Sequence, residues 1–516
     1  MGSDSDSETE GRDLLRSIHS FSCGGRHYAV EGTSGSAFEL DSHLARALAG
    51  IRDPGTVPQP PLDSRAASEA GAGLEELREK VRRSARGGAR LRWREERERS
   101  PRAVELCLCA SFRCNLACAY CFVRLGSQRR QKASADMTLE TAKAAVEFAL
   151  DQLTAASDQL IVSFGHTGEP LLSKALYAKL GEYVRRRAAD TGRRIAYGMA
   201  ATNLTLAGEG DVPNPAWLTV SLDGPREIHD QVRRTRAGDG TYDVVVSAFR
   251  RLLASLPTEA AGANLVATLT RRSTDIRGIF LHLVSLGAPF VTLSPARLPP
   301  TSDLAITEAA ADELLAGYDD LLQHLLSLGG DSLAHHLGCM VHAQDYFGRH
   351  VLRIALGHRV TRRCDAGTGL FAVTPDGSLF PCPELAALGC MPIGSIHGGI
   401  RESVVSELRS RDVRKLAPCA ACWARLWCGG ECLSHRAMYQ AFGSPPDPGM
   451  CRFTRGLIER AIHLVSWLRR TNSDALRTVL DSRAHQITGV KPLPGEPHST
   501  QPARANTDCE TRGTPA

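Results

Sequence analysis

Six short apolar segments alternate with amphipathic stretches between residues 104 and 297. In the stretches 139–153 and 242–256 the apolar side chains recur at helical spacing. Strands that alternate with helices in this way predict parallel βα units. Six units fall short of the eight that close a full barrel, so we expect an α/β fold built on an open, partial (βα)6 TIM-like barrel. The six segments are 104–110, 159–165, 194–203, 217–224, 263–270 and 289–295.

Polar side chains follow these segments at the end where parallel barrels carry their chemistry. Three cysteines follow the first segment, and residues with carboxylate, hydroxyl and guanidinium groups stand at the ends of the next three. Because these strand ends meet at one rim of the barrel, we expect the groups to lie together there. This rim is the candidate active site. The other residues are Gly168 and Glu169 after the second segment, Asn203 at the end of the third, Ser221 and Asp223 at the end of the fourth, and Arg233 after it.

The stretch "CNLACAYCF" (114–122) spaces Cys114, Cys118 and Cys121 as C-x3-C-x2-C. A [4Fe–4S] cluster has four irons, so three thiolates leave one iron open to a bidentate small molecule. A closed structural zinc site needs four ligands, commonly from paired C-x2-C knuckles, and fits this spacing poorly. Tyr120 stands just before the last thiol, where its ring can stack on an adenine beside the open iron.

This loop resembles the cluster loop of radical S-adenosylmethionine (SAM) enzymes. The resemblance implies that SAM chelates the open iron and that one-electron reduction yields a 5′-deoxyadenosyl radical, which abstracts hydrogen from a substrate. "TGEP" (167–170) is similar to the family's Gly-Gly-Glu-Pro loop, with Thr167 in place of the first glycine. By this resemblance we expect Gly168 and Glu169 to hold the amino group of SAM.

Two further stretches, "SLDGP" and "HDQVR", are similar to another segment of that family. By resemblance, Ser221 contacts the SAM ribose, Arg233 the SAM carboxylate, and Asn203 the rim of the site. Asp223 and Glu384 are the acid–base candidates for the reaction on the substrate.

A second cysteine array lies downstream, and its seven thiols are too many for one four-coordinate metal. Their order and spacing resemble the SPASM domain, a C-terminal extension of some radical SAM enzymes with two auxiliary [4Fe–4S] clusters. With the first site, the resemblance implies three [4Fe–4S] clusters. It assigns Cys364, Cys382 and Cys432 to one auxiliary cluster, and Cys419, Cys422, Cys428 and Cys451 to the other.

The first auxiliary set has only three thiols, because Leu370 occupies the place where some members carry a further cysteine. Either that iron is open to substrate or another group fills it, and Cys339 and Cys390 are the spare thiols. Buried, inert thiols are the expectation for both. Cys107 and Cys109 alternate along the first strand, so both point one way and are expected to pack in the core.

The SPASM extension is best known from peptide and protein maturases, so we expect a peptide or protein substrate. One branch makes formylglycine with an Asp directly after the second extension cysteine, but this chain has Pro383 there. Another branch crosslinks ribosomally made peptides, and its members often carry a small N-terminal module that grips the precursor's leader. Residues 18–50 resemble such a module, and the basic stretch 79–102 is either a patch for an acidic leader or a solvated helix. A small-molecule substrate and a non-catalytic zinc scaffold are the remaining alternatives.

Composition and charge exclude little beyond this. The net charge of +5 is too small to indicate a nucleic-acid partner, and the sequence has no apolar run of about 18 residues for a membrane span. We expect a cytoplasmic enzyme that takes electrons from a reductant such as a flavodoxin or ferredoxin. The expected segments are 1–13 disordered, 14–50 a small N-terminal module, 51–102 a linker and basic helix, 103–300 the radical SAM core, 301–360 a helical connector, 361–470 the SPASM domain, and 471–516 a short helix and disordered tail.

Overall fold

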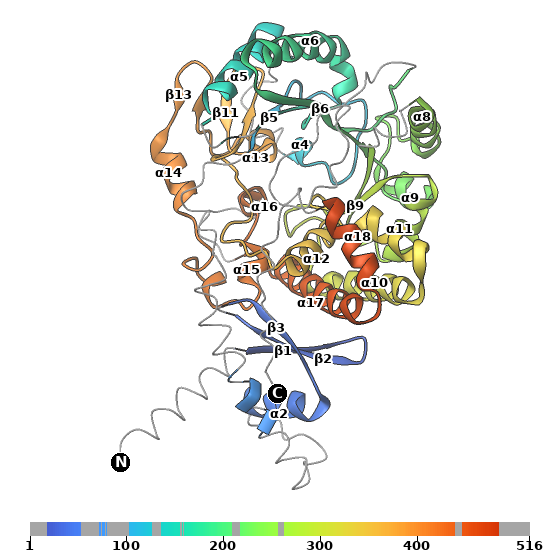
Figure 1. Cartoon of the computed structure of the whole chain (residues 1–516). Coiled ribbons are helices and arrows are strands. Elements are labelled where there is room, and N and C mark those ends of the chain that lie inside the picture. Colours follow the sequence, from blue (N-terminus) through green and yellow to red (C-terminus); the bar gives the residue numbers. More distant parts are fainter. Residues whose placement is uncertain are drawn as a thin grey trace, which may run out of the picture.

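The computed structural model contains one large sheet wrapped by helices and a small sheet below it (Figure 1). The large sheet has ten strands in the order β13-β12-β11-β10-β4-β5-β6-β7-β8-β9. The small one has three, in the order β1-β2-β3. The structure describes residues 18–32, 34–52, 72–73, 75–77, 79, 103–125, 136–154, 157, 159–208, 217–255, 263–438 and 446–483.

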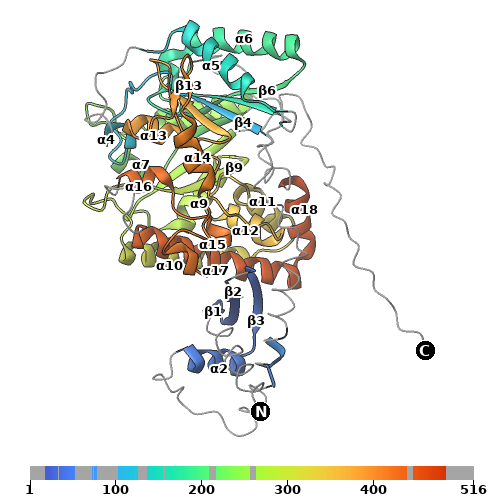
Figure 2. The ribbon, with the colours of Figure 1, turned by 90° about the vertical axis from the view of Figure 1, so that its left-hand side faces the viewer.

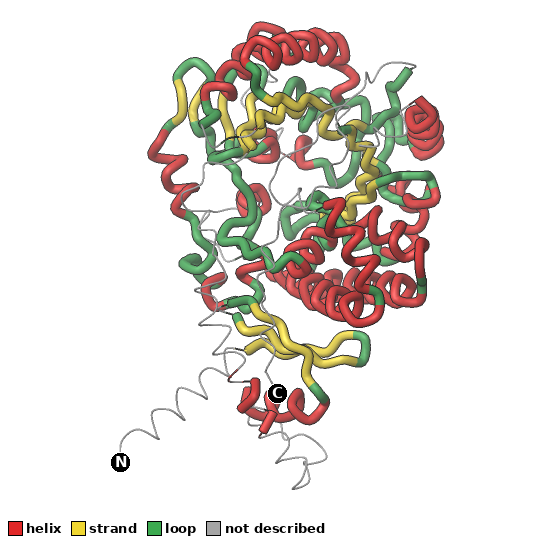
Figure 3. Tube along the Cα trace, in the orientation of Figure 1, coloured by secondary structure: helices red, strands yellow, loops and turns green. Residues whose placement is uncertain are grey.

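Six consecutive parallel strands form the open barrel, which confirms the six segments expected from the sequence. In Figure 3 these strands follow one another along a curved arc, with helices outside it. The strands are β4 (Ala103–Leu108), β5 (Gln159–Phe164), β6 (Arg194–Thr202), β7 (Leu218–Ser221), β8 (Ala263–Leu269) and β9 (Phe290–Pro295). The helices between them include α5 (Leu139–Asp151), α6 (Lys174–Thr191), α8 (Tyr242–Ser255) and α9 (Ile276–Ser285), with the short α4 (Phe122–Leu125), η1 (Pro170–Ser173) and α7 (Arg226–Val232).

Apolar residues on both faces of the strands build the core. All six residues of β5 are buried, as expected for a strand covered on both sides. Cys107 and Cys109 lie on one face of β4 and pack against Ala372, Phe380 and Ala386. Their predicted place in the core is therefore confirmed.

Four strands from the C-terminal part of the chain extend the barrel sheet beyond β4. β10 (Leu370–Val373) pairs in parallel with β4, joining segments more than 250 residues apart in the sequence. β11 (Ser378–Phe380), β12 (Gly394–Ser395) and β13 (Gly399–Ile400) then add antiparallel strands. The cysteine-rich region is thereby joined to the edge of the barrel, which the sequence did not predict.

Helices fill the rest of this half of the molecule. The connector contains α10 (Glu308–Ser327), α11 (Gly330–Met340) and α12 (Gly348–Ala355), and α10 packs along the long α17 (Pro448–Thr471). The cysteine-rich region has only short elements: α13 (Pro383–Leu388), α14 (Glu402–Ser410), η2 (Cys419–Ala421), α15 (Arg425–Cys428) and α16 (Leu433–Met438), and α18 (Ser473–Arg483) follows α17. None of the described helices is long and apolar enough to cross a membrane.

The N-terminal module consists of β1 (Ile18–Cys23), β2 (Arg26–Glu31), β3 (Ser36–Leu40) and α2 (Ser42–Arg52). Gly24 and Gly25 both have positive φ and form the turn between β1 and β2. The module lies against α17, away from the barrel rim (Figures 1 and 2). The Tyr28 hydroxyl is 2.9 Å from Nδ1 of His463, which fixes β2 to that helix.

Parts of the expected organisation fall outside the described residues. They are residues 1–13, the basic stretch beyond residue 79 as far as 102, and the tail beyond 483.

Candidate active site

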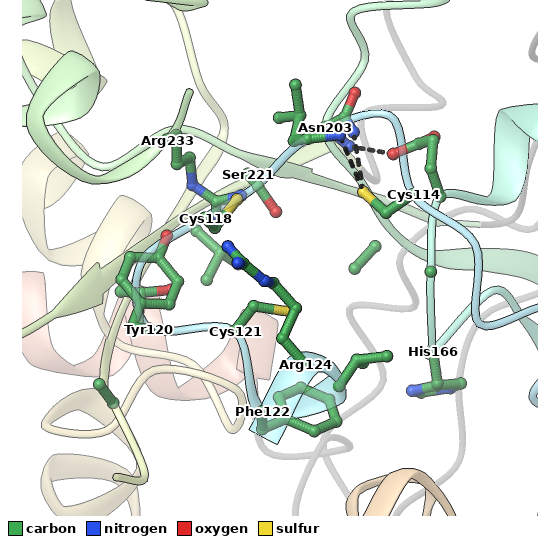
Figure 4. A pocket seen from close by; sticks show the side chains of 18 of the residues that line it. Cys114, Cys118, Tyr120, Cys121, Phe122, Arg124, His166, Asn203, Ser221 and Arg233 are labelled. Carbon is green, nitrogen blue, oxygen red and sulfur yellow. Dashed lines mark hydrogen bonds between the residues drawn. The ribbon is translucent and has the colours of Figure 1, made fainter. Parts of the chain in front are cut away.

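A cavity of about 580 Å³ opens at the C-terminal rim of the barrel. All three cysteines of the 114–121 loop line it, and Figure 4 shows them around one space. The predicted residues Tyr120, Gly168, Glu169, Asn203, Ser221, Arg233 and Glu384 line it too. The structure thus brings together ten residues that lie as far apart in the sequence as 114 and 384.

N–H groups are directed at two of the three thiols. The backbone N–H of Leu116 donates to Sγ of Cys114 at 3.4 Å, and Nδ2 of Asn203 donates to the same sulfur at 3.8 Å. Nη1 of Arg233 lies 3.8 Å from Sγ of Cys118. Burial raises the pKa of Cys114 to about 11, so the free thiol keeps its proton at neutral pH. A metal that displaces the proton would leave an anionic sulfur. The N–H groups of Leu116, Asn203 and Arg233 would then stabilise that charge, so they fit metal-bound thiolates.

The loop that carries Glu169 packs directly on the cysteine loop. Gly168 has φ +67°, and a Cβ there would lie 2.3 Å from the carbonyl oxygen of Arg113, so only glycine permits this approach. The N–H of Glu169 donates to that same carbonyl at 2.8 Å. Thr167, which replaces the family's first glycine, donates its hydroxyl to the carbonyl of Ser111 at 2.9 Å. The threonine thus adds a bond between the two loops.

The Glu169 carboxylate is held by three donors. The hydroxyl of Thr202 donates at 2.6 Å, the N–H of Asn203 at 2.8 Å and the N–H of Leu171 at 3.1 Å. Glu169 is 2% exposed. Burial raises the pKa of its carboxyl group, although the three hydrogen bonds work against that rise. A cation such as an ammonium group in the cavity would favour the ionised form.

Asp223 is part of a buried network and does not line the cavity. It accepts Nε–H of Arg233 at 3.0 Å and the N–H of Thr268 at 2.9 Å, and the Tyr120 hydroxyl also donates to it. These bonds use both carboxylate oxygens, so the geometry favours a positioning role over the expected acid–base role. The Arg233 guanidinium lies over the Tyr120 ring, 5.4 Å from its centroid, and covers one face of the ring expected to stack on adenine.

Glu384 reaches the cavity from the opposite side, at the start of α13. Its Oε1 accepts Nη1–H of Arg297 at 2.8 Å. Burial works to raise the pKa of Glu384, but the charge of Arg297, together with hydrogen bonds and His166, holds that pKa below its ordinary value. Glu384 is therefore an ionised carboxylate beside the cavity, and it is the better placed of the two acid–base candidates.

Several of the downstream thiols raise one another's pKa. Burial raises the pKa of Cys382 well above its ordinary value, and Glu384, Cys432 and Cys364 raise it further. Burial and then Cys428 and Cys419 raise the pKa of Cys451 to about 12. Burial and Cys428 raise the pKa of Cys422. The division of these thiols between two clusters stays a prediction.

The two spare thiols lie elsewhere. The Cys339 thiol is buried in α11 and donates to the carbonyl of Ala288 at 3.6 Å. The Cys390 thiol donates to the carbonyl of Leu388 at 3.5 Å. Neither contact joins it to the group of Cys364, Cys382 and Cys432.

Among the described residues, Glu105, Cys107 and His166 bring three potential ligand atoms within 4.8 Å of one another. None of these three residues is an expected cluster ligand.

Sequence reasoning missed several cavity residues, namely Arg124, His166, Arg236 and Arg297. His166 follows β5 directly and lies 2.7 Å from the Ser163 hydroxyl through Nε2, so its place after a barrel strand could have indicated it. Arg236 donates to the carbonyl of Cys114 at 2.9 Å and closes over the cysteine loop. Nothing in its local sequence indicates this contact.

Comparison with known proteins gives a likeness of fold. No family model matches the chain. The solved structure of native anSMEcpe with bound AdoMet, a radical SAM enzyme, is similar at 20% identity with a TM-score of 0.56, over 70% of this chain and 99% of that one. Native anSMEcpe with AdoMet and the Cp18Cys peptide gives 19% identity and a TM-score of 0.55, over 70% and 99%. SuiB of Streptococcus suis bound to the precursor peptide SuiA gives 13% identity over 83% and 96%, but its TM-score of 0.44 is too low to support a statement about this chain.

At these identities the likeness establishes the fold alone. The chain therefore has the fold of the radical SAM enzymes, the family that its three-cysteine loop resembles.

Proposed function

We propose that this protein is a radical SAM maturase that acts on a peptide or protein. The observation that carries the proposal is the cavity itself, where three thiols and a buried carboxylate converge at the C-terminal end of a barrel. The fold likeness to anSMEcpe with its AdoMet supports the same conclusion. The modification would be a crosslink or another oxidation of the substrate.

The cavity residues divide into those that hold a cluster and those that hold SAM. Cys114, Cys118 and Cys121 would ligate a [4Fe–4S] cluster, and Glu169 would accept the amino group of SAM. Together, cluster and SAM would supply a radical able to take hydrogen from the substrate. The protein would orient the substrate hydrogen and keep water and other hydrogen donors out of the cavity. Two auxiliary [4Fe–4S] clusters would lie in the two groups of downstream thiols and accept the electron that remains.

A peptide substrate is supported by one comparison, since the structure of anSMEcpe includes a bound Cp18Cys peptide. We further propose that the N-terminal module binds a leader segment of the substrate. Among the described strands, β1 pairs only with β2, and its other edge is the one that would accept an extended peptide.

Formylglycine formation is the second candidate, and Glu384 is the observation that favours it. Pro383 cannot act as a base, but the carboxylate of the next residue lines the cavity. Arg297 would have to release Glu384 before that carboxylate could take a proton. Crosslinking needs no such release, so it remains the first candidate.

The test is anaerobic co-expression with the short reading frame nearest the gene, followed by high-resolution mass spectrometry of the peptide. We expect a loss of two hydrogens for each event, and fragmentation would locate the new bond or a formylglycine. The Cys114→Ala, Cys118→Ala, Cys121→Ala variant should give the unmodified mass. Cys339→Ala is the matched control, because this thiol is buried in α11 against the carbonyl of Ala288, and it should modify the peptide normally. If a panel of neighbouring peptides and sulfatase-type peptides keeps its mass with iron-replete protein, the peptide assignment is wrong.

A further inference from the structure

Arg233 lines the cavity, and its guanidinium contacts the loop that carries the three cysteines. Its Nε is bound to Asp223 at 3.0 Å, and its Nη1 lies 3.8 Å from Sγ of Cys118. Its guanidinium also lies over the Tyr120 ring. Figure 4 shows Arg233 beside Cys118 at the edge of the cavity.

The side chain has little freedom to leave this position. Arg233 is 8% exposed, and its partner Asp223 is 2% exposed. Asp223 is fixed from two further sides, since the N–H of Thr268 donates to Oδ1 and the Tyr120 hydroxyl donates to Oδ2. The backbone is fixed as well, because the N–H of Arg233 donates to the carbonyl of His229 and its own carbonyl accepts the Thr241 hydroxyl at 3.1 Å.

We propose that Arg233, held by Asp223, is a positioning residue that donates an N–H···S bond to Cys118 and raises the reduction potential of the cluster on the three thiols. The inference rests on the proposed function, since it requires that cluster. Reduction adds negative charge to an iron–sulfur cluster, and hydrogen bonds to its sulfurs and nearby positive charge favour the reduced form. Asn203 makes the corresponding contact to Cys114 without a charge.

This role differs from the contact with the SAM carboxylate that the motif implies, and the two make different predictions. An arginine that serves the cluster affects its potential before SAM is added. An arginine that serves only SAM affects SAM affinity and leaves the potential of the SAM-free protein unchanged.

The test is an anaerobic redox titration of the full-length, iron-replete protein without SAM, followed by electron paramagnetic resonance. The signal of the three-thiol site is identified as the one missing from the Cys114→Ala, Cys118→Ala, Cys121→Ala variant. We expect Arg233→Gln to move its midpoint to a more negative potential at an unchanged iron content. Arg226→Gln is the matched control, because Arg226 begins α7, the helix that Arg233 follows, and pairs on the surface with Asp243, and it should leave the midpoint in place.

Arg233→Lys covers the case in which the glutamine variant does not fold. A lysine ammonium keeps the positive charge beside Asp223 but lacks the guanidinium fork that donates to Asp223 and Cys118 together, so the midpoint should become more negative by less than in the glutamine variant. If both variants fold and their midpoints equal that of the wild type, the inference is wrong. If Arg233→Gln does not fold, an unchanged midpoint in Arg233→Lys overturns the inference by itself. A wild-type protein whose three thiols hold no iron–sulfur cluster would instead overturn the proposed function, and with it this inference.

Discussion

Glu169 shows how one residue depends on three separate elements of the fold. Its donors come from the end of β6 and from η1, and its own N–H reaches back to the cysteine loop. Gly168 makes this possible, because any larger residue would collide with the Arg113 carbonyl. The sequence motif predicted both residues, but only the structure shows that three donors orient the carboxylate.

Replacing Glu169 should weaken SAM binding. We expect Glu169→Gln to lower SAM affinity by about 10- to 100-fold, because a charged hydrogen bond is worth about 1.5–3 kcal/mol. Isothermal titration calorimetry under anaerobic conditions measures this directly. Glu182→Gln on the exposed face of α6 is the control and should bind SAM normally. Equal affinities in the two variants would remove Glu169 from the SAM site.

At the scale of elements, the barrel was predictable and its extension was not. The six strands are apolar, four to nine residues long and separated by helices, so their pattern alone identifies them. β10 has only four residues, and its partner β4 lies far away in the sequence, so no local signal indicates the pairing. The cavity residues that stand at the C-terminal end of a barrel strand could be predicted from the sequence. Arg236 and Arg297 escaped prediction because they act on segments distant in the sequence.

Close packing of α10 on α9 gives a prediction about an element. A Cβ on Gly317 of α10 would lie 2.4 Å from the backbone carbonyl of Thr274, at the start of α9. Gly317→Ala should therefore lower the free energy of unfolding by about 1–3 kcal/mol. Gly338→Ala in α11 is the control, since nothing lies within 4 Å of a Cβ there, and it should raise stability by up to about 1 kcal/mol. Urea unfolding followed by circular dichroism compares the two, and equal stabilities would contradict the close contact.

At the scale of the whole molecule, buried histidines connect stability to pH. Burial lowers the pKa of both His229 and His342 to about 4. His229 accepts the N–H of Asp223 through Nδ1 at 3.2 Å, which requires an unprotonated nitrogen. His342 lies 3.0 Å from the carbonyl of Val291. Both histidines are neutral in the folded protein, but the unfolded chain takes up their protons as the pH falls through about 6.5.

The folded protein should therefore lose stability between pH 7.5 and pH 5.5. Each histidine lowers the free energy of unfolding by about 1.3 kcal/mol over this range, because its pKa is lower in the folded than in the unfolded protein. Asp345 acts in the opposite direction, because burial raises its pKa to about 6. Its contribution to the free energy of unfolding therefore rises as the pH falls from 7.5 to 5.5, and this offsets about 0.8 kcal/mol of the loss from the histidines. We expect a lower urea midpoint at pH 5.5 and a smaller pH effect in His229→Gln. His397→Gln, at an exposed position, should behave as wild type, and a midpoint independent of pH would contradict these pKa shifts.

The central claim is that the three thiols and Glu169 support reductive cleavage of SAM. The most direct measurement incubates the anaerobic, iron-replete protein with SAM and a strong reductant and quantifies 5′-deoxyadenosine by mass spectrometry. We predict its formation by the wild type and by Cys339→Ala, and none by the Cys114→Ala, Cys118→Ala, Cys121→Ala variant. Iron-replete wild-type protein that forms no 5′-deoxyadenosine, or a triple variant that forms as much as wild type, would contradict the account.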